Sequence, residues 1–164
     1  MRNKILLSVA VLGLSIDASA NPINLASIIA HEDNLEATKQ RLARVYRVSV
    51  PTINALTLIE SSNNPRARSG AGAHGLMQIN QSHVGGVLCP EARRVDDLYN
   101  PVINTICGAR ILRYELNRYN DDLALALAAY NGGPKCVRNK QILCKESRRH
   151  SEKVLLEIAR ALSN

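Results

Sequence analysis

The sequence contains neither tryptophan nor phenylalanine, and its only aromatic residues besides histidine are five tyrosines. A platform of several stacked rings for sugars or nucleobases is therefore nearly excluded, and the core must be built from Leu, Ile, Val and Ala. Long basic tracts are also missing. The doublets Arg93-Arg94 and Arg148-Arg149 accompany no nucleic-acid motif, so we expect no nucleic-acid partner. With 164 residues, 46% of them apolar and 21% charged, the chain is typical of one globular domain.

One long apolar run is present, and it lies at the N-terminus. Ile5 to Ile16 follows the cations Arg2 and Lys4 and precedes the small residues Ala18-Ser19-Ala20. This order is typical of a secretory signal peptide. A membrane anchor is the alternative, but the run is short for a hydrocarbon core of about 30 Å, and Asp17 closes it.

We therefore expect residues 1–20 to be a cleaved signal peptide and residues 21–164 to form a single domain, exported to the periplasm or cell envelope. No integral membrane segment is expected after cleavage. Loss of two cations and one acid with the signal peptide would lower the formal net charge from +7 to +6. A basic exported protein can bind an anionic polymer, although solvated surface charge is the simpler explanation.

Four cysteines, Cys89, Cys107, Cys136 and Cys144, follow the signal segment. An even number in an exported protein indicates two disulfides. A zinc site is the alternative, but no C-x-x-C pair and no histidine at ligand spacing is present, so we expect no metal. Of the possible pairings we predict Cys89–Cys107 and Cys136–Cys144, because these close short loops without a long crossing.

The pattern of the exported part predicts a mainly α fold with at most a minor hairpin. Start and stop signals, chiefly capping residues, prolines and glycines, delimit the expected helices. These are a helix from a capping box at Asp33 to about Tyr46, one from Pro51 to before Asn64-Pro65, a short one over 75–81, one after Asn100-Pro101, one from Asn120 or Asp121 to before Gly132, and a last one through Leu162.

Glu60 lies on an otherwise apolar helix face. Ile53, Leu56, Thr57 and Glu60 are spaced at i, i+3, i+4 and i+7 and so share one side. A carboxylate on a packed surface is costly unless it is paired or protonated, and the last turn of a helix disfavours a further negative charge. Both effects favour the protonated acid, which is what general-acid catalysis requires. A solvated Glu60 on a protruding helix end is the alternative.

Three ordered blocks contain this glutamate and further motif residues. They are Glu60–Pro65 (E-S-x-x-N-P), Ser69–Gln78 (S-x-x-G-A-x-G-L-M-Q) and Ala129–Pro134 (A-Y-N-x-G-P). Together they resemble the soluble lytic transglycosylases, lysozyme-like enzymes that cut peptidoglycan strands. The helix expected after Asn100-Pro101, with Asn104 and Gly108, resembles the family's helix between the second and third blocks. The resemblance implies a small helical domain of the goose-type lysozyme and transglycosylase kind, with a substrate cleft and without a metal or organic cofactor.

The resemblance also implies roles for single residues. It makes Glu60 the sole catalytic acid and base, places Ser69 beside that acid, assigns sugar binding to Gln78, and puts Tyr130 and Asn131 along the cleft. The helical pattern independently points the Tyr130 ring inward, where its hydroxyl needs a partner, and Glu60 is a candidate. A core tyrosine with another acceptor and a loop-bracing Gln78 are the alternatives.

One position departs from the family pattern. Glu146, in a segment that resembles the family's E-T-R element, could brace the cleft and contact substrate, or could simply cap the last helix. The family commonly has a tyrosine four residues later, where this chain has His150. Either His150 substitutes for that tyrosine or the role has moved. We expect His31, His74 and His83 on the surface or in loops, outside catalysis.

The implied reaction is cleavage of the β-1,4 bond between N-acetylmuramic acid and N-acetylglucosamine, giving 1,6-anhydro-muramic acid ends. A hydrolytic muramidase on the same fold and a non-catalytic peptidoglycan-binding scaffold are the alternatives. The expected partners are peptidoglycan glycan strands. A small exported domain suits local wall opening for a secretion, conjugation or pilus complex, with housekeeping wall turnover as the alternative.

Overall fold

Polar caps fix the start of most helices in the computed structural model, which describes residues 34–163. Each cap side chain accepts backbone N–H groups that the first helical turn leaves free. In chain order, the capped helices are α2 (Leu35–Tyr46) after Asn34, α3 (Val50–Ser61) after Ser49, α4 (Pro101–Arg118) after Asn100, and α5 (Leu123–Gly132) after Asp122. The last helix, α6, spans Lys145–Ser163.

The mainly α architecture is confirmed, but two predicted caps are wrong. Asp122 caps α5, because Asn120 and Asp121 have positive φ values of 53° and 62° and form the turn after α4. Asp33 lies outside the described residues, but the cap of α2 is its neighbour Asn34, whose Oδ1 accepts the N–H groups of Glu36 and Ala37.

The signal segment 1–20 and His31 also lie outside the described residues. No helix between residues 34 and 163 is both long and apolar enough to cross a membrane.

Residues 75–81 do not form the short helix that the sequence predicts. The chain instead makes an antiparallel hairpin of β1 (Ala73–His74) and β2 (Ile79–Asn80). Gly75 and Gln78 have positive φ values of 78° and 49°, which a right-handed helix does not accommodate.

Further short elements occupy the connections between the helices. They are the 3-10 helices η1 (Gln81–His83), η2 (Val95–Tyr99) and η3 (Pro134–Cys136), and a second hairpin of β3 (Val137–Arg138) and β4 (Gln141–Ile142). The minor hairpin expected from the sequence is thus present twice.

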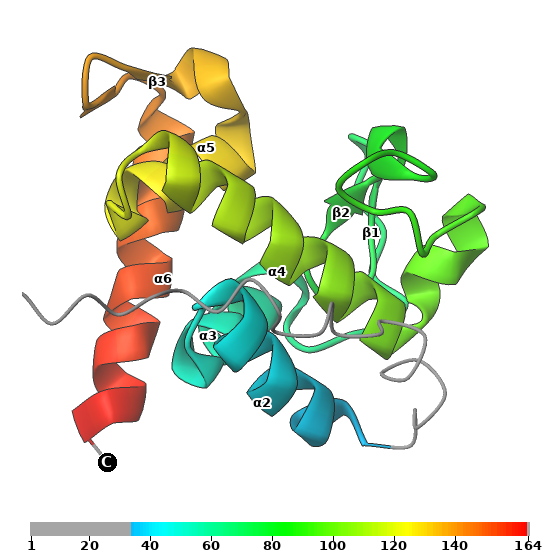
Figure 1. Ribbon diagram of the computed structural model, residues 1–164. Coiled ribbons are helices and arrows are strands. Elements are labelled where there is room, and N and C mark those ends of the chain that lie inside the picture. The colour runs from blue at the N-terminus through cyan, green and yellow to red at the C-terminus, as the bar shows by residue number, and fades with distance from the viewer. Residues whose placement is uncertain (1–33, 164) are drawn as a thin grey trace, which may run out of the picture.

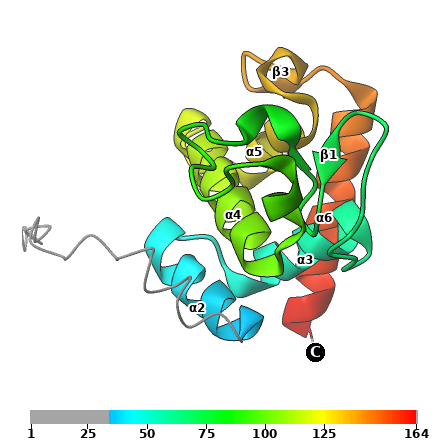
Figure 2. The same cartoon turned by 90° about the vertical axis from the view of Figure 1, so that its right-hand side faces the viewer.

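Helix α4 crosses the middle of the molecule and contacts α2, α5 and β2 (Figure 1). Helix α6 packs against α5 and also against α3, which is distant in sequence, and Figure 2 shows α3 and α6 side by side. The space between these helices is filled mainly by aliphatic side chains, as the lack of large aromatics predicts. The largest fully buried ones are Leu42, Ile53, Leu56, Met77, Ile79, Leu98, Ile106, Leu112, Leu127 and Val154.

Both predicted disulfides are present. Cys89 pairs with Cys107 and Cys136 with Cys144, with Cα–Cα distances of 4.8 and 5.0 Å. The first bond ties the loop before η2 to α4, and the second joins η3 to the residue before α6. The four sulfur atoms are therefore joined in pairs rather than arranged as zinc ligands.

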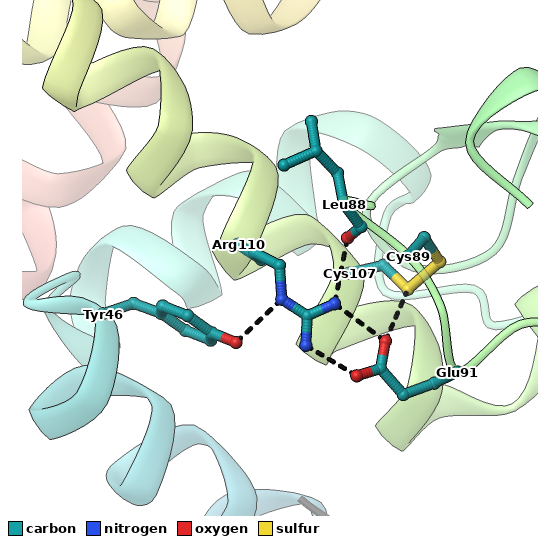
Figure 3. A network of polar contacts seen from close by, with 6 residues as sticks. All are labelled: Tyr46, Leu88, Cys89, Glu91, Cys107 and Arg110. Carbon is teal, nitrogen blue, oxygen red and sulfur yellow. Dashed lines mark hydrogen bonds and ion pairs between the residues drawn. A yellow bond between two sulfur atoms is a disulfide. The ribbon is translucent and has the colours of Figure 1, made fainter. Parts of the chain in front are cut away.

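A buried ion pair lies beside the first disulfide (Figure 3). The Arg110 guanidinium on α4 donates to both Glu91 carboxylate oxygens, at 2.6 and 2.9 Å. It also donates to the Tyr46 hydroxyl at 2.9 Å and the Leu88 carbonyl at 3.2 Å. The guanidinium donors of Arg110 thus connect α4 to the end of α2 and to the loop before η2. These bonds fix one side of the fold.

Candidate active site

A cleft of about 290 Å³ lies among the ends of α3 and α5, the loop before β1, the end of η1 and the middle of α4. It brings together five of the six residues that the sequence singles out for catalysis and substrate binding. Its lining comprises Glu60, Ser69, Ala71, Ala73, Gln78, Ile79, Asn80, His83, Ile111, Tyr130 and Asn131. A larger hollow of about 670 Å³, between the α2–α3 turn and the end of α4, contains none of them.

Glu60 is held at the base of this cleft by the burial of its helix face. Ile53 and Leu56 are fully buried, Thr57 is 2% exposed, and the Glu60 side chain is 12% exposed. The alternative of a solvated glutamate on a protruding helix end is therefore excluded. A carboxyl in this position loses most of its water and sits at the negative end of the α3 dipole.

The ionisable side chain in contact with Glu60 is His150, from the second turn of α6. The His150 Nε2 lies 2.8 Å from the Glu60 Oε1, and the His150 side chain is 11% exposed. Both ring nitrogens are buried, and within residues 34–163 neither makes a hydrogen bond of good geometry. The approach to Oε1 is therefore a close contact that lies off the N–H direction.

Tyr130 points into the fold as expected, but its predicted partner is wrong. The hydroxyl donates to the Met77 carbonyl at 2.8 Å rather than to Glu60. Burial, with the nearby charge of Glu60 as a second cause, raises the pKa of Tyr130 well above its ordinary value. The phenol therefore keeps its proton and binds the β1–β2 loop to α5.

The β1–β2 loop is held in place by Asn104 on α4, and the Asn104 side chain is fully buried. The Asn104 Oδ1 accepts the Met77 backbone N–H at 2.7 Å, and its Nδ2 donates to the carbonyls of His74 and Leu98, each at 2.8 Å. Gly75 must be glycine here, because its φ is positive and a Cβ would lie 2.2 Å from the Asn104 Nδ2. The amide thus positions Met77, and Met77 positions Tyr130.

Ser69 and Gln78 border the cleft with one polar atom each engaged elsewhere. The Ser69 Oγ accepts the Ala73 N–H at 3.0 Å, so its own proton remains free to donate. The Gln78 Nε2 donates to the carbonyls of Gly75 and Ala67 at 3.0 and 3.3 Å. Gln78 therefore braces a loop, which is the alternative given for it in the sequence analysis. Its amide oxygen takes part in neither of these two hydrogen bonds.

Asn131 and Glu146 differ in position. Asn131 lines the cleft, and its Oδ1 accepts the Ser147 hydroxyl at 3.2 Å. Glu146 is exposed in the first turn of α6 and is not among the lining residues. The structure therefore does not bring Glu146 together with the other predicted residues.

Two histidines add to what the sequence indicates. His83 lines the cleft, and burial lowers its pKa, which favours the neutral imidazole. His74 is 2% exposed, and its Nδ1 lies 2.9 Å from the Tyr99 hydroxyl, so the expectation of a surface or loop role for His74 is wrong. The contact of His150 with Glu60 agrees with the alternative in which His150 substitutes for the family tyrosine.

Replacing Tyr130 with phenylalanine tests the connection between α5 and the β1–β2 loop. The variant leaves the Met77 carbonyl without its donor, so we expect a loss of about 1–2 kcal/mol in the free energy of unfolding. In thermal unfolding, each kcal/mol corresponds to about 2–4 °C at this chain length. Tyr114→Phe is the matched control, because Tyr114 is 46% exposed and should change stability little. Equal melting temperatures for the two variants would contradict the role given to the hydroxyl.

Comparison with known proteins places these features in a family. The family model of the transglycosylase SLT domain matches residues 38–154, most of the described chain. A transglycosylase of Enterobacteria phage PRD1 is 38% identical over 88 residues, and the soluble lytic murein transglycosylase of Salmonella typhimurium is 33% identical over 102 residues. The solved structure of an inactive mutant of lytic transglycosylase Slt from Pseudomonas aeruginosa superposes with a TM-score of 0.65 at 26% identity.

These relatives are longer than the present chain. The match covers 54% of this chain and 31% of the phage protein, and 60% of this chain and 16% of the Salmonella protein. The structural match covers 77% of this chain and 24% of the Pseudomonas chain. The chain thus spans less than a third of each relative.

Proposed function

This chain belongs to the transglycosylase SLT family, and we propose that it is a lytic transglycosylase of peptidoglycan. In this proposal it cleaves the β-1,4 bond between N-acetylmuramic acid and N-acetylglucosamine and leaves a 1,6-anhydro-muramic acid end. The observation that carries the proposal is the content of the cleft. Among the described residues that line it, Glu60 is the one carboxylate.

A single carboxylate decides between classes of glycosidic cleavage. Most glycoside hydrolases place two carboxyl groups across the scissile bond, about 5–10 Å apart, so that one protonates the leaving oxygen and the other attacks carbon or activates water. The further polar groups of the described lining are those of Ser69, Gln78, Asn80, His83, Tyr130 and Asn131, and none is a second carboxylate. Burial lowers the pKa of His83, which favours its neutral form, and raises the pKa of Tyr130, which keeps its proton. This favours a chemistry in which one group gives a proton and later takes one back.

The proposed reaction uses Glu60 twice. The protonated carboxyl gives its proton to the glycosidic oxygen, and the C–O bond to the muramic acid breaks. The acetamido group of that sugar stabilises the developing cation. The resulting Glu60 carboxylate then removes the proton of the C6 hydroxyl, whose oxygen closes the anhydro ring. Glu60 ends protonated and no water is consumed.

The remaining lining residues would bind and orient the sugar chain. Ser69 has a hydroxyl proton free to donate, and Gln78 has an amide oxygen that carries neither loop bond. We assign both, together with Asn131, to hydrogen bonds with sugar groups. We assign Tyr130 to the wall of the cleft, because its hydroxyl already binds Met77. Glu146 is better placed to stabilise the start of α6, where a negative charge is favourable.

Mass spectrometry of the products tests this function. Purified peptidoglycan sacculi are digested with the protein, and the released muropeptides are weighed. We expect anhydro ends. Products heavier by one water would instead show a hydrolytic muramidase, and release of no product while sacculi are bound would show a scaffold.

The setting that we propose is the periplasm or cell envelope. The signal-like residues 1–20 favour export, and the two disulfides fit an oxidising compartment. There the enzyme would open the wall locally, in support of a secretion, conjugation or pilus complex.

A further inference from the structure

We propose that His150 is the positioning residue of Glu60 and that the two side chains share one proton across the neutral pH range. The proposal rests on the proposed function for its activity test, but a second measurement below is independent of activity. His150 acts through Glu60 and is given no contact with substrate.

The geometry of the pair gives the first argument. The Nε2 and Oε1 atoms are 2.8 Å apart, and both side chains are about nine-tenths buried. The His150 Nδ1 is buried without a hydrogen-bond partner within the described chain, so no second bond fixes the ring. In this proposal a small rotation of the ring brings its Nε2–H into line with the carboxyl oxygen, and a proton passes directly between the two atoms.

The surroundings give the second argument, because few other charges face the pair. Helix α6 packs mainly against α3, α5 and β4. The ionisable side chains of these three elements are Glu60 on α3 and Tyr130 on α5, and β4 has none. The neighbours of His150 one turn away on α6 are Glu146 and Lys153, and both are exposed.

Two further groups complete the surroundings, and both favour a neutral form. Tyr130 keeps its proton, and His83, in the same cleft, has its pKa lowered by burial. Of these groups, His150 is the one in contact with Glu60, and histidine is the residue type that changes charge between about pH 5 and 8.

The pair has two one-proton forms. In the open cleft, an imidazolium beside a carboxylate is stabilised by attraction and by the remaining water. When a glycan covers the cleft, that water is lost, and the charged pair becomes more costly than a neutral imidazole beside a neutral carboxylic acid. The Nε2–H bond then breaks as the Oε1–H bond forms. Substrate binding thus leaves Glu60 in the form that donates a proton.

The pH dependence of cleavage distinguishes this pair from a merely structural contact. The rate at saturating sacculi is measured from pH 5 to 9 for the native enzyme, His150→Gln and His150→Tyr. In the native enzyme the rate should fall only when the shared proton is lost. Neither glutamine nor tyrosine takes up a proton in this range. We therefore expect the alkaline limb of the pH–rate profile, where the rate falls with rising pH, to move to lower pH by about one unit or more in both variants.

Two variants serve as controls for this shift. The hydroxyl of His150→Tyr can still bind the carboxyl, so its rate at pH 5 should be nearer the native rate than that of His150→Gln. Arg149→Gln removes a positive charge from an exposed position next to His150 and should leave the limb in place. A native limb position in both His150 variants would overturn the proposal, whatever their rates.

Nuclear magnetic resonance titration tests the pair without relying on activity. The imidazole signal of His150 is identified by its loss in His150→Gln and is followed with pH in the native protein and in Glu60→Gln. We expect His150 to hold its proton to higher pH in the native protein, because only the native partner can become negative. Equal midpoints would refute the shared proton. If the native enzyme cleaves nothing, the proposed function fails, while this titration still decides the pair.

Discussion

Glu60→Gln is expected to lower the release of muropeptides from purified sacculi by at least about 100-fold. Glutamine keeps the size of the side chain but can neither give a proton to the glycosidic oxygen nor take one from the C6 hydroxyl. Both halves of the proposed reaction therefore stop. The cleft offers no second carboxylate among its described lining residues to replace the lost group.

Stability measurements separate this effect from misfolding. Glutamine removes a carboxylate from a largely buried position at the negative end of α3, which offsets the loss of its pairing with His150, so the free energy of unfolding should not fall by more than about 1 kcal/mol. Glu152→Gln, at an exposed position on α6, is the matched control and should keep the native rate. A 100-fold loss leaves about 1% of the native rate. If a folded Glu60→Gln enzyme keeps more than about 1%, another residue has the catalytic role.

Asn104→Leu is expected to cause the largest loss of stability of any change in the cleft support. Leucine has a similar size but cannot accept the Met77 N–H or donate to the carbonyls of His74 and Leu98. Each buried backbone group left unpaired costs about 1–3 kcal/mol, so the three together predict a loss of about 3 kcal/mol or more. Urea denaturation measures it directly.

The same variant should also lower cleavage, because Asn104 holds Met77 and Met77 holds Tyr130 at the cleft wall. Asn54→Leu is the matched control: Asn54 is exposed on α3, and its replacement should change stability by about 0.5 kcal/mol at most. A loss of stability for Asn104→Leu that is no larger than for this control would contradict the central role of the buried amide.

Local signals were sufficient for much of the fold. Proline and asparagine at Asn100-Pro101 mark the start of α4 correctly, and the spacing from Ile53 to Glu60 identifies the buried face of α3. The shortest-loop argument pairs the cysteines correctly, because both bonds connect segments that are close in sequence. These features depend on neighbours within a few turns of chain.

Long-range contacts were harder to predict. The acceptor of the Tyr130 hydroxyl is a backbone carbonyl at Met77, which no side-chain pattern identifies. The region 75–81 has composition compatible with a helix, but Asn104 binds backbone groups on both sides of its turn and stabilises a hairpin instead. The pairing of His150 with Glu60 depends on how α6 packs on α3, and periodicity within one helix does not contain that information.

The packing of α6 on α3 has a consequence for the order in which the candidate site is assembled during synthesis. Glu60 lies in the second described helix, and its partner His150 lies in the last one. During synthesis the chain presents the glutamate before the histidine. The contact between the acid and His150 therefore forms only after the final helix has docked on α3.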